Sequence, residues 1–396
     1  MIKKVKYLLV EHSSLAVMGV GSLFLFLANI SLKEVLNIHD YYQYSIIITV
    51  ITLLNSFGAL GMDQVFLRLS EIQFKKNIIV DVKIIYISVI GTSVSSFIGC
   101  YYLKEIANLE TNYVVLFLLC FGVILTMLLY NVFRLSSDFF ISQLIQNSWK
   151  FFMGILAAAY LISVKRFDYV LLLVIFMWGF IFLSFVLLIK QQKILLQNTV
   201  NYSVVLKYSL NFFITLLTLS FVAQGDRFLI EEFFSKKDFG DYFFLATLFL
   251  FPFSLFQSYI GFKELVFIKT EKLNLSHKLK RISLGTFVFS LVLLIVVFFL
   301  SKLNIISLDF FSNIYLILIF IIMGNIRMLY SLFSAIIGAT ASLSKIKKLN
   351  ILFLTLVVLS LFVFVMFVNK SVLAVTVYFC FLWLSRLVLW GYYSIN

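Results

Sequence analysis

The sequence predicts an all-α integral membrane protein with about twelve transmembrane helices. Of its 396 residues, 62% are hydrophobic and only 13% are charged, whereas a soluble domain is about half apolar and about a quarter charged. Apolar runs long enough to span a bilayer, about 20 residues each, recur along the whole chain. A single proline and the low charge content leave no room for a proline-rich linker or an appended soluble domain.

The predicted spans follow one another with short polar connections. The fifth span follows a polar stretch, 139–149, which we expect to form an interfacial helix leading into that span. The twelve runs cover residues 13–32, 41–62, 84–103, 113–133, 149–164, 169–189, 208–230, 242–262, 282–300, 313–338, 349–368 and 372–392.

The distribution of basic residues predicts the orientation. With the N-terminus inside, the cytoplasmic segments hold 22 of the 32 lysines and arginines, Arg386 included, and the opposite side holds 8. Cytoplasmic loops of membrane proteins carry such an excess of positive charge. We therefore expect both termini in the cytoplasm, and the net charge of +14 does not indicate nucleic-acid binding.

The two halves of the chain resemble each other. A shift of 198 residues aligns five identical pairs: Glu34 with Glu232, Asp40 with Asp238, Tyr44 with Tyr242, Thr49 with Thr247 and Ser56 with Ser254. Six spans separate the copies, so both halves have the same orientation and would be related by an axis along the membrane normal. We expect two six-helix lobes, 1–198 and 199–396, with a transport site between them.

Three motifs, in this order and spacing, resemble the polysaccharide flippases of the multidrug/oligosaccharidyl-lipid/polysaccharide exporter superfamily, and most of all the O-antigen (Wzx-type) flippases. They are the turn 40–44 with the following Gly61-Met62-Asp63, the segment 207–210 with the later Asp226-Arg227, and the turn 238–242. The chain lacks the Leu-Pro that often opens the second half in that family, and its only proline is Pro252. The resemblance implies export of an undecaprenyl-diphosphate-linked oligosaccharide across a bacterial plasma (inner) membrane.

Arg327, in Gly324-Asn325-Ile326-Arg327, is the strongest candidate for a substrate-binding residue. It falls near the middle of the tenth span, where arginine is rare and usually functional. A guanidinium binds phosphate through its fork of donors. We expect Arg327, together with Asn325, to line a wet cavity. The alternative is a structural ion pair with an acid on a neighbouring helix.

Asp226 and Arg227 are the second candidate pair, near the outer end of the seventh span. Neighbouring residues on a helix point about 100° apart, so we do not expect these two side chains to bind each other. Arg227 would face the cavity and Asp226 would find another partner. The alternative is an interfacial anchor beside Glu231 and Glu232.

Asp63 and Arg68 lie where the second span meets the cytoplasm. They either form a gate with the basic loop 263–281 or cap the end of the helix. That loop holds six basic residues, which follow from the positive-inside rule as readily as from attraction of the donor lipid.

No nucleotide-binding loop, nucleophile elbow, metal-ligand spacing or cofactor motif occurs, so we expect a transporter rather than an enzyme. The drive would be a H⁺ or Na⁺ gradient, or removal of product by later enzymes. Expected partners are the lipid-linked oligosaccharide, membrane lipids and a polysaccharide polymerase with its chain-length machinery. Alternatives are an ion-coupled drug/cation antiporter of the same fold, or a membrane polysaccharide polymerase.

Overall fold

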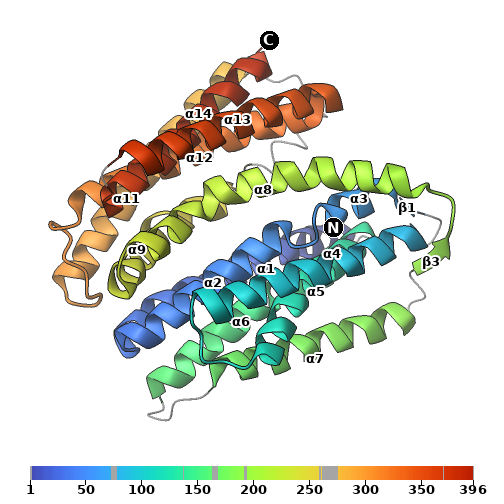
Figure 1. The fold of residues 1–396 in the computed structure, drawn as a ribbon, viewed down its shortest axis with the longest axis horizontal. Coiled ribbons are helices and arrows are strands. Elements are labelled where there is room, and N and C mark those ends of the chain that lie inside the picture. The colour runs from blue at the N-terminus through green and yellow to red at the C-terminus, as the bar shows by residue number, and fades with distance from the viewer. Residues whose placement is uncertain are drawn as a thin grey trace. The chain divides into compact units, whose positions relative to one another are not determined.

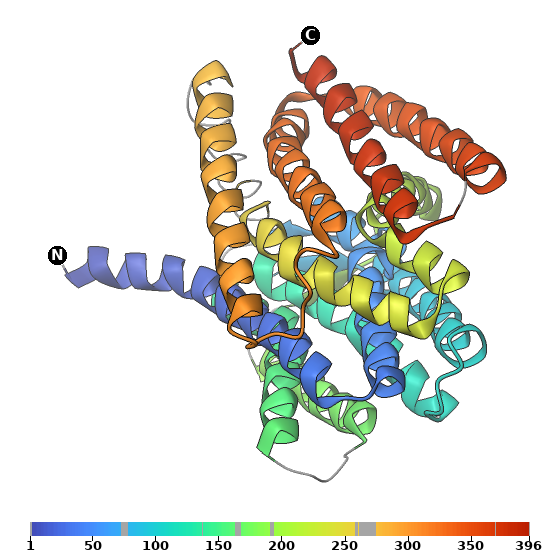
Figure 2. The same cartoon turned by 90° about the vertical axis from the view of Figure 1, so that its left-hand side faces the viewer.

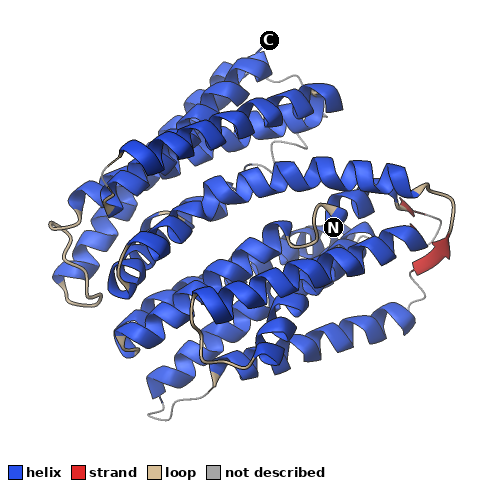
Figure 3. Ribbon diagram, in the orientation of Figure 1, coloured by secondary structure: helices blue, strands red, loops and turns tan. Residues whose placement is uncertain are grey.

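The computed structural model describes residues 2–72, 78–136, 138–162, 168–190, 194–257, 260, 275–368 and 370–395. Helices make up nearly all of it (Figures 1 and 3). In the first part of the chain they are α1 (Ile2–Val35), α2 (Ile38–Phe57), α3 (Met62–Leu69), α4 (Val82–Tyr101), the π-helical turn η2 (Tyr102–Ile106), α5 (Tyr113–Leu135), α6 (Phe139–Ile162) and α7 (Tyr169–Lys190). The second part holds α8 (Tyr202–Phe233), α9 (Lys236–Phe249), α11 (Leu275–Lys302), α12 (Ile314–Thr340), α13 (Leu343–Phe367) and α14 (Val372–Ile395).

The prediction of an all-α integral membrane protein is confirmed. Among the described residues, 10 helices are long and apolar enough to cross a membrane, or 11 if a bent pair is counted as one further span. The bent pair is α9 with Phe251–Gln257, which meet at 42°. Pro252 lies at this bend, and proline both lacks an N–H donor and clashes with the preceding turn, so it bends or breaks a helix there.

The polar stretch before the fifth span is helical and leads directly into that span. Helix α6 runs without a break from Phe139 to Ile162. Its polar residues keep it out of the set of apolar spans, yet Asn147 and Ser148 are buried. A polar helix is stable here because its polar face is covered by neighbouring helices.

The chain divides into two compact units, which we describe separately. Unit 1 comprises Met1–Val35 and Gln43–Ser220, and unit 2 comprises Leu36–Tyr42 and Phe221–Asn396. Helix α8 therefore contributes its first part to unit 1 and its last part to unit 2, and the first turn of α2 belongs to unit 2. The lobe boundary at residue 198 stays a prediction.

Close helix packing holds unit 1 together. Helix α1 lies along α6, and α5 contacts α4, α6 and α7. Lipid tails are as apolar as leucine, so helices in a membrane associate where small residues allow close approach. Gly154 of α6 lies against the ring of Phe24, and a Cβ atom on Gly21 would come within 2.8 Å of the Asn147 Cβ. From Gly21–Asn147 to Phe24–Gly154, the contact moves towards the C-terminus on both helices, so α1 and α6 run parallel.

A small sheet at one end of unit 1 was not predicted from the sequence. Strand β1 (Glu71–Ile72) pairs antiparallel with β2 (Ile78–Asp81), and β2 pairs parallel with β3 (Ile194–Gln197) (Figure 3). The strands are too short to give a periodic hydrophobic pattern of their own, which is why the sequence analysis missed them.

Asp81 joins this sheet to the start of α8. Its Oδ1 accepts a hydrogen bond from the Lys83 N–H at 2.9 Å, which caps α4, and its Oδ2 accepts from the N–H groups of Thr199 and Val200, each at 2.8 Å. Burial by itself opposes ionisation of this carboxyl. The backbone donors and the Lys83 charge outweigh burial, so the pKa of Asp81 lies below its ordinary value.

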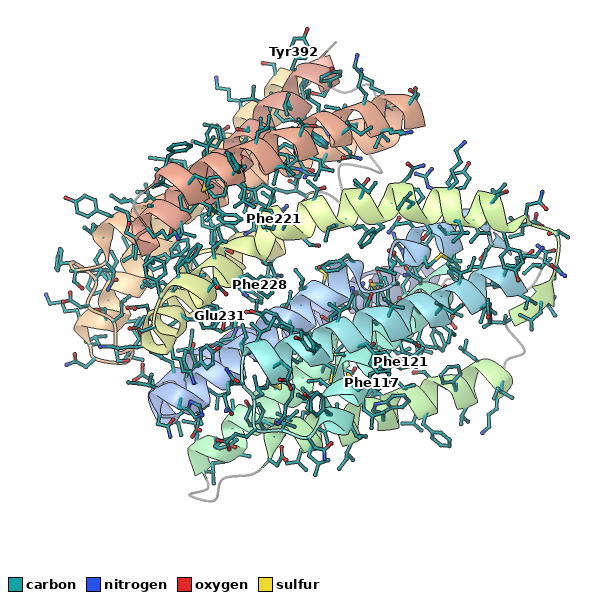
Figure 4. All side chains as sticks on the ribbon, viewed as in Figure 1. Phe117, Phe121, Phe221, Phe228, Glu231 and Tyr392 are labelled. Carbon is teal, nitrogen blue, oxygen red and sulfur yellow. The ribbon has the colours of Figure 1, made fainter. Side chains whose placement is uncertain are left out.

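Unit 2 is built around α12. This helix packs along α14 (Figure 2) and also contacts α11 and α9, while α13 packs against α14. Gly324 of α12 lies directly against the ring of Phe253, so a side chain at position 324 would displace that ring. The first turn of α2 joins this unit through Tyr42, whose hydroxyl donates to Glu231 Oε1 at 2.8 Å near the end of α8 (Figure 4).

The helix boundaries reproduce the sequence repeat. Helix α1 ends at Val35 and α2 begins at Ile38, while α8 ends at Phe233 and α9 begins at Lys236. Each boundary of the second pair is displaced from the first by the same 198 residues that align the five identities. The two copies therefore share the same helix–turn–helix, down to the residue.

Candidate functional site

A buried carboxylate on α8 is the starting point of the candidate site in unit 2. Asp226 is 3% exposed, and its Oδ2 accepts a hydrogen bond from the Tyr242 hydroxyl of α9 at 2.6 Å. Its Oδ1 accepts from the Arg227 backbone N–H at 2.9 Å. Tyr242 is 1% exposed. The partner that we expected Asp226 to find is thus Tyr242. Residues 238–242, predicted as a turn, lie instead in the first turns of α9.

The repeat places an equivalent hydrogen bond in unit 1. Tyr44, which aligns with Tyr242, donates through its hydroxyl to Asn29 Oδ1 of α1. The acceptors are not aligned by the repeat, because the 198-residue shift pairs Asn29 with Arg227 and Ala28 with Asp226. Each half therefore bonds the aligned tyrosine to the first helix of its pair, through an amide 15 residues earlier in the first half and a carboxyl group 16 residues earlier in the second.

Two arginines complete the cluster. Asp226 interacts electrostatically with both Arg227 and Arg327, although Arg327 lies on α12. The Arg327 guanidinium carbon sits 4.9 Å from the centre of the Trp383 ring on α14. Position 327 is the midpoint of α12, as the sequence predicted.

The arginine side chains differ from Asp226 in accessibility. Arg227 and Arg327 are both partly exposed, while Asp226 is buried. The Arg227 guanidinium carbon lies 4.9 Å from the centre of the Phe243 ring on α9. The Nε of Arg327 has no hydrogen-bond partner among the described residues. The cluster thus holds two guanidinium groups near one carboxyl group, and the Nε donor of Arg327 is open to a further acceptor.

Asn325 is not brought to this cluster. Its Nδ2 donates to Ser290 Oγ of α11 and to the Ile321 carbonyl, each at 2.8 Å. Two residues along a helix point about 200° apart, so Asn325 and Arg327 lie on nearly opposite faces of α12. Asn325 therefore holds α11 against α12 rather than lining a site with Arg327.

Asp63 and Arg68 lie together on the short helix α3 of unit 1. Asp63, 5% exposed, accepts a hydrogen bond from Gln64 Nε2, and its Oδ1 has no partner among the described residues. Arg68 is exposed and stacks over the Phe212 ring of α8 at 4.9 Å. Most of the basic loop that would complete a gate, 261–274, lies outside the described residues.

Lys150 is a cation whose position sequence reasoning misplaced. The charge count put it among the cytoplasmic basic residues, but it lies midway along α6. Its Nζ donates to Asn147 Oδ1 at 2.8 Å, one turn earlier on the same helix. Because α1 and α6 are parallel, Lys150 lies level with residues 21–24 of α1, inside the span that begins at Ala16. The polar run that suggested an interfacial helix was the available signal.

Arg386 is a buried cation. The charge count placed it near the last cytoplasmic boundary, and in the structure it is 2% exposed within unit 2. Trp383, which stacks with Arg327, likewise had no signal in the sequence beyond its place in an apolar span. The signal available in the sequence was helical spacing: Trp383 and Arg386 are three residues apart, so they lie on the same face of α14.

The chemistry that this cluster supports is binding of an anion. Guanidinium groups on α8 and α12 present planar donors, and they lie against the Phe243 and Trp383 rings in the electrostatic range of Asp226. Among the described side chains, no group of three or more His, Cys, Asp or Glu residues could hold a metal ion. Comparison of the chain with protein-family models, with curated proteins and with solved structures finds no match.

Proposed function

We propose that this protein is a flippase that moves an undecaprenyl-diphosphate-linked oligosaccharide, an O-antigen unit or a related repeat, from the cytoplasmic to the outer leaflet of a bacterial plasma membrane. The proposal rests on the resemblance of the three motifs to O-antigen flippases. The observation that carries it is the pair of partly exposed guanidinium groups, Arg227 and Arg327, on transmembrane helices of unit 2.

The physical argument concerns the diphosphate. Carrying a charged headgroup through hydrocarbon costs many kcal/mol unless protein groups replace its hydration. Two arginines held beside Asp226 supply fixed positive charge and bidentate donors inside the membrane. The polyprenyl tail stays in lipid, so the protein only has to accommodate the phosphates and sugars. The distribution of basic residues supports an orientation with both termini in the cytoplasm. In that orientation, transport would begin with the lipid in the inner leaflet.

The test is complementation of a strain lacking the gene. Wild-type protein should restore surface polysaccharide and clear lipid-linked units from the inner leaflet. Arg327→Ala should restore neither, at normal protein level by immunoblot, and Arg327→Lys should restore part of the export because it keeps the charge without the donor fork. Arg134→Ala, at an exposed position on α5, is the matched control and should complement fully. A fully active Arg327→Ala protein would refute the assignment of the site.

An ion-coupled drug/cation antiporter is the second candidate, because Asp226 is a buried carboxyl group bonded to a buried tyrosine. Such a group can exchange a proton or Na⁺ for a cationic substrate. The gene deletion separates the two functions: loss of drug resistance with normal surface polysaccharide supports the antiporter. In that case Asp226→Asn should abolish drug efflux while Arg327→Ala retains it.

A further inference from the structure

Arg386 of α14 is enclosed by aromatic rings within unit 2. Its guanidinium carbon lies 4.4 Å from the centre of the Trp390 ring, 4.9 Å from Phe353 and 5.1 Å from Tyr330. The side chain is 2% exposed, and its Nε and Nη1 have no hydrogen-bond partner among the described residues. These rings come from α12, α13 and α14, so the packing of three helices creates the enclosure.

Ring faces alone leave this cation incompletely compensated. The quadrupole of an aromatic face attracts a cation, but a face cannot accept every N–H bond that a guanidinium offers. A buried charge is tolerated when it is both paired and hydrogen-bonded. Arg386 has the rings and lacks the pair among the described residues.

The sequence of this region holds no acid to supply the missing charge. From Phe310 to the last residue, Asn396, the chain contains no Asp or Glu, although it contains six basic residues. The nearest described acid of the candidate site, Asp226, interacts with Arg227 and Arg327. Among the described residues, Arg386 therefore has aromatic contacts and two unpaired N–H groups but no acidic partner.

We propose that Arg386 is the centre of an anion-binding site that takes one small anion, of the size of chloride or of a phosphate group. The site is distinct from the cluster at Asp226. Arg327 stacks on Trp383, and Trp383 meets Tyr330 edge-on with ring centres 5.5 Å apart, so this aromatic pair lies between the two arginines. The phosphate group can be that of dissolved phosphate or of an anionic lipid. The proposal concerns the folded protein and does not depend on the transported substrate.

The experiment measures the thermal unfolding midpoint of the purified full-length protein in nanodiscs of phosphatidylcholine. Chloride or phosphate is titrated against gluconate, a larger organic anion, at constant ionic strength. A ligand that binds only the folded state raises the midpoint, and saturation should raise it by about 3 °C in wild type. Nanodiscs containing phosphatidylglycerol should show the higher midpoint without added anion if the lipid phosphate fills the site.

Three variants make the result specific. Arg386→Met should fold, since replacing a buried charge by an apolar side chain of similar volume is often neutral or stabilising, and its midpoint should not respond to the anion. Arg386→Lys, which keeps the charge with fewer donors, should respond about tenfold more weakly in anion concentration. Arg134→Met removes an exposed arginine and should respond as wild type does. The same shift in wild type and Arg386→Met, or no shift in wild type, overturns the proposal.

Discussion

The paired hydrogen bonds Tyr242–Asp226 and Tyr44–Asn29 allow one interaction to be measured twice in one protein. The two tyrosines occupy equivalent positions of the repeat and both are at most 1% exposed. The acceptor is a carboxyl group in the second half and an amide in the first, and it lies one repeat position earlier in the second half. Removing each hydroxyl by a tyrosine-to-phenylalanine substitution leaves helix packing nearly unchanged.

The expected coupling energies follow from the acceptors. A hydrogen bond between neutral groups in a membrane protein contributes about 0.6 kcal/mol in double-mutant cycles. A hydrogen bond to a charged group contributes about 1.5–3 kcal/mol. We therefore expect the cycle of Tyr242→Phe with Asp226→Ala to give a coupling at least about 1 kcal/mol larger than the cycle of Tyr44→Phe with Asn29→Ala.

The assay is reversible unfolding of the purified protein in mixed micelles, titrated with a denaturing detergent and followed by tryptophan fluorescence. Arg327→Ala provides a further check, because removing a charge that interacts with Asp226 should lower the Tyr242–Asp226 coupling and leave the Tyr44–Asn29 coupling unchanged. Equal coupling energies in the two halves would refute the reasoning, since they would show that the carboxyl group behaves as a neutral acceptor.

Three further predictions concern unit 1 and the orientation of the chain. Asp81→Asn should lower the free energy of unfolding by about 1–2 kcal/mol at pH 7, measured by urea titration. Because the pKa of Asp81 is lower in the folded protein than in the unfolded chain, this difference from wild type should persist down to about pH 4, the unfolded pKa. It should vanish as the pH falls through the folded pKa. Gly61→Ala should destabilise the folded protein by more than about 1 kcal/mol in the same unfolding assay. Gly61 has a φ of +78°, and a Cβ atom there would lie 2.6 Å from the Ser209 carbonyl oxygen. Gly19→Ala is the control and should be neutral or stabilising, because a Cβ atom on Gly19 meets open space. In a cysteine-free background, Glu110→Cys should react with an impermeant maleimide in intact cells and Lys348→Cys only after permeabilisation; the reverse pattern would overturn the proposed orientation.

Composition and the repeat were enough to predict the class of fold and much of the helix plan. A chain this apolar must satisfy its backbone hydrogen bonds internally, and helices do so within one segment. The position of Arg327 at the centre of α12 also followed from counting apolar residues. The interfacial position expected for 139–149 stays a prediction; the stretch forms the start of α6, and neighbouring helices bury its Asn147 and Ser148.

Side-chain partners could not be read in the same way. The sequence placed Asn325 beside Arg327 in a cavity, but the helical repeat turns Asn325 towards Ser290 on α11. It treated Arg386 as a boundary charge, while three helices enclose it in aromatic rings. Which face of a helix meets which neighbour depends on packing across the whole unit, and local patterns do not contain that information.

The sequence by itself determined that this chain is a helical membrane protein and that its first helical hairpin recurs 198 residues later, because hydropathy and residue identity are properties of the chain alone. Only the tertiary structure decided that Asp226 bonds to Tyr242, that both neighbouring arginines share its charge, and that Lys150 and Arg386 lie within helix packing. The physical reason is that charges inside a membrane are stabilised by partners from other helices, and those partners are distant in sequence.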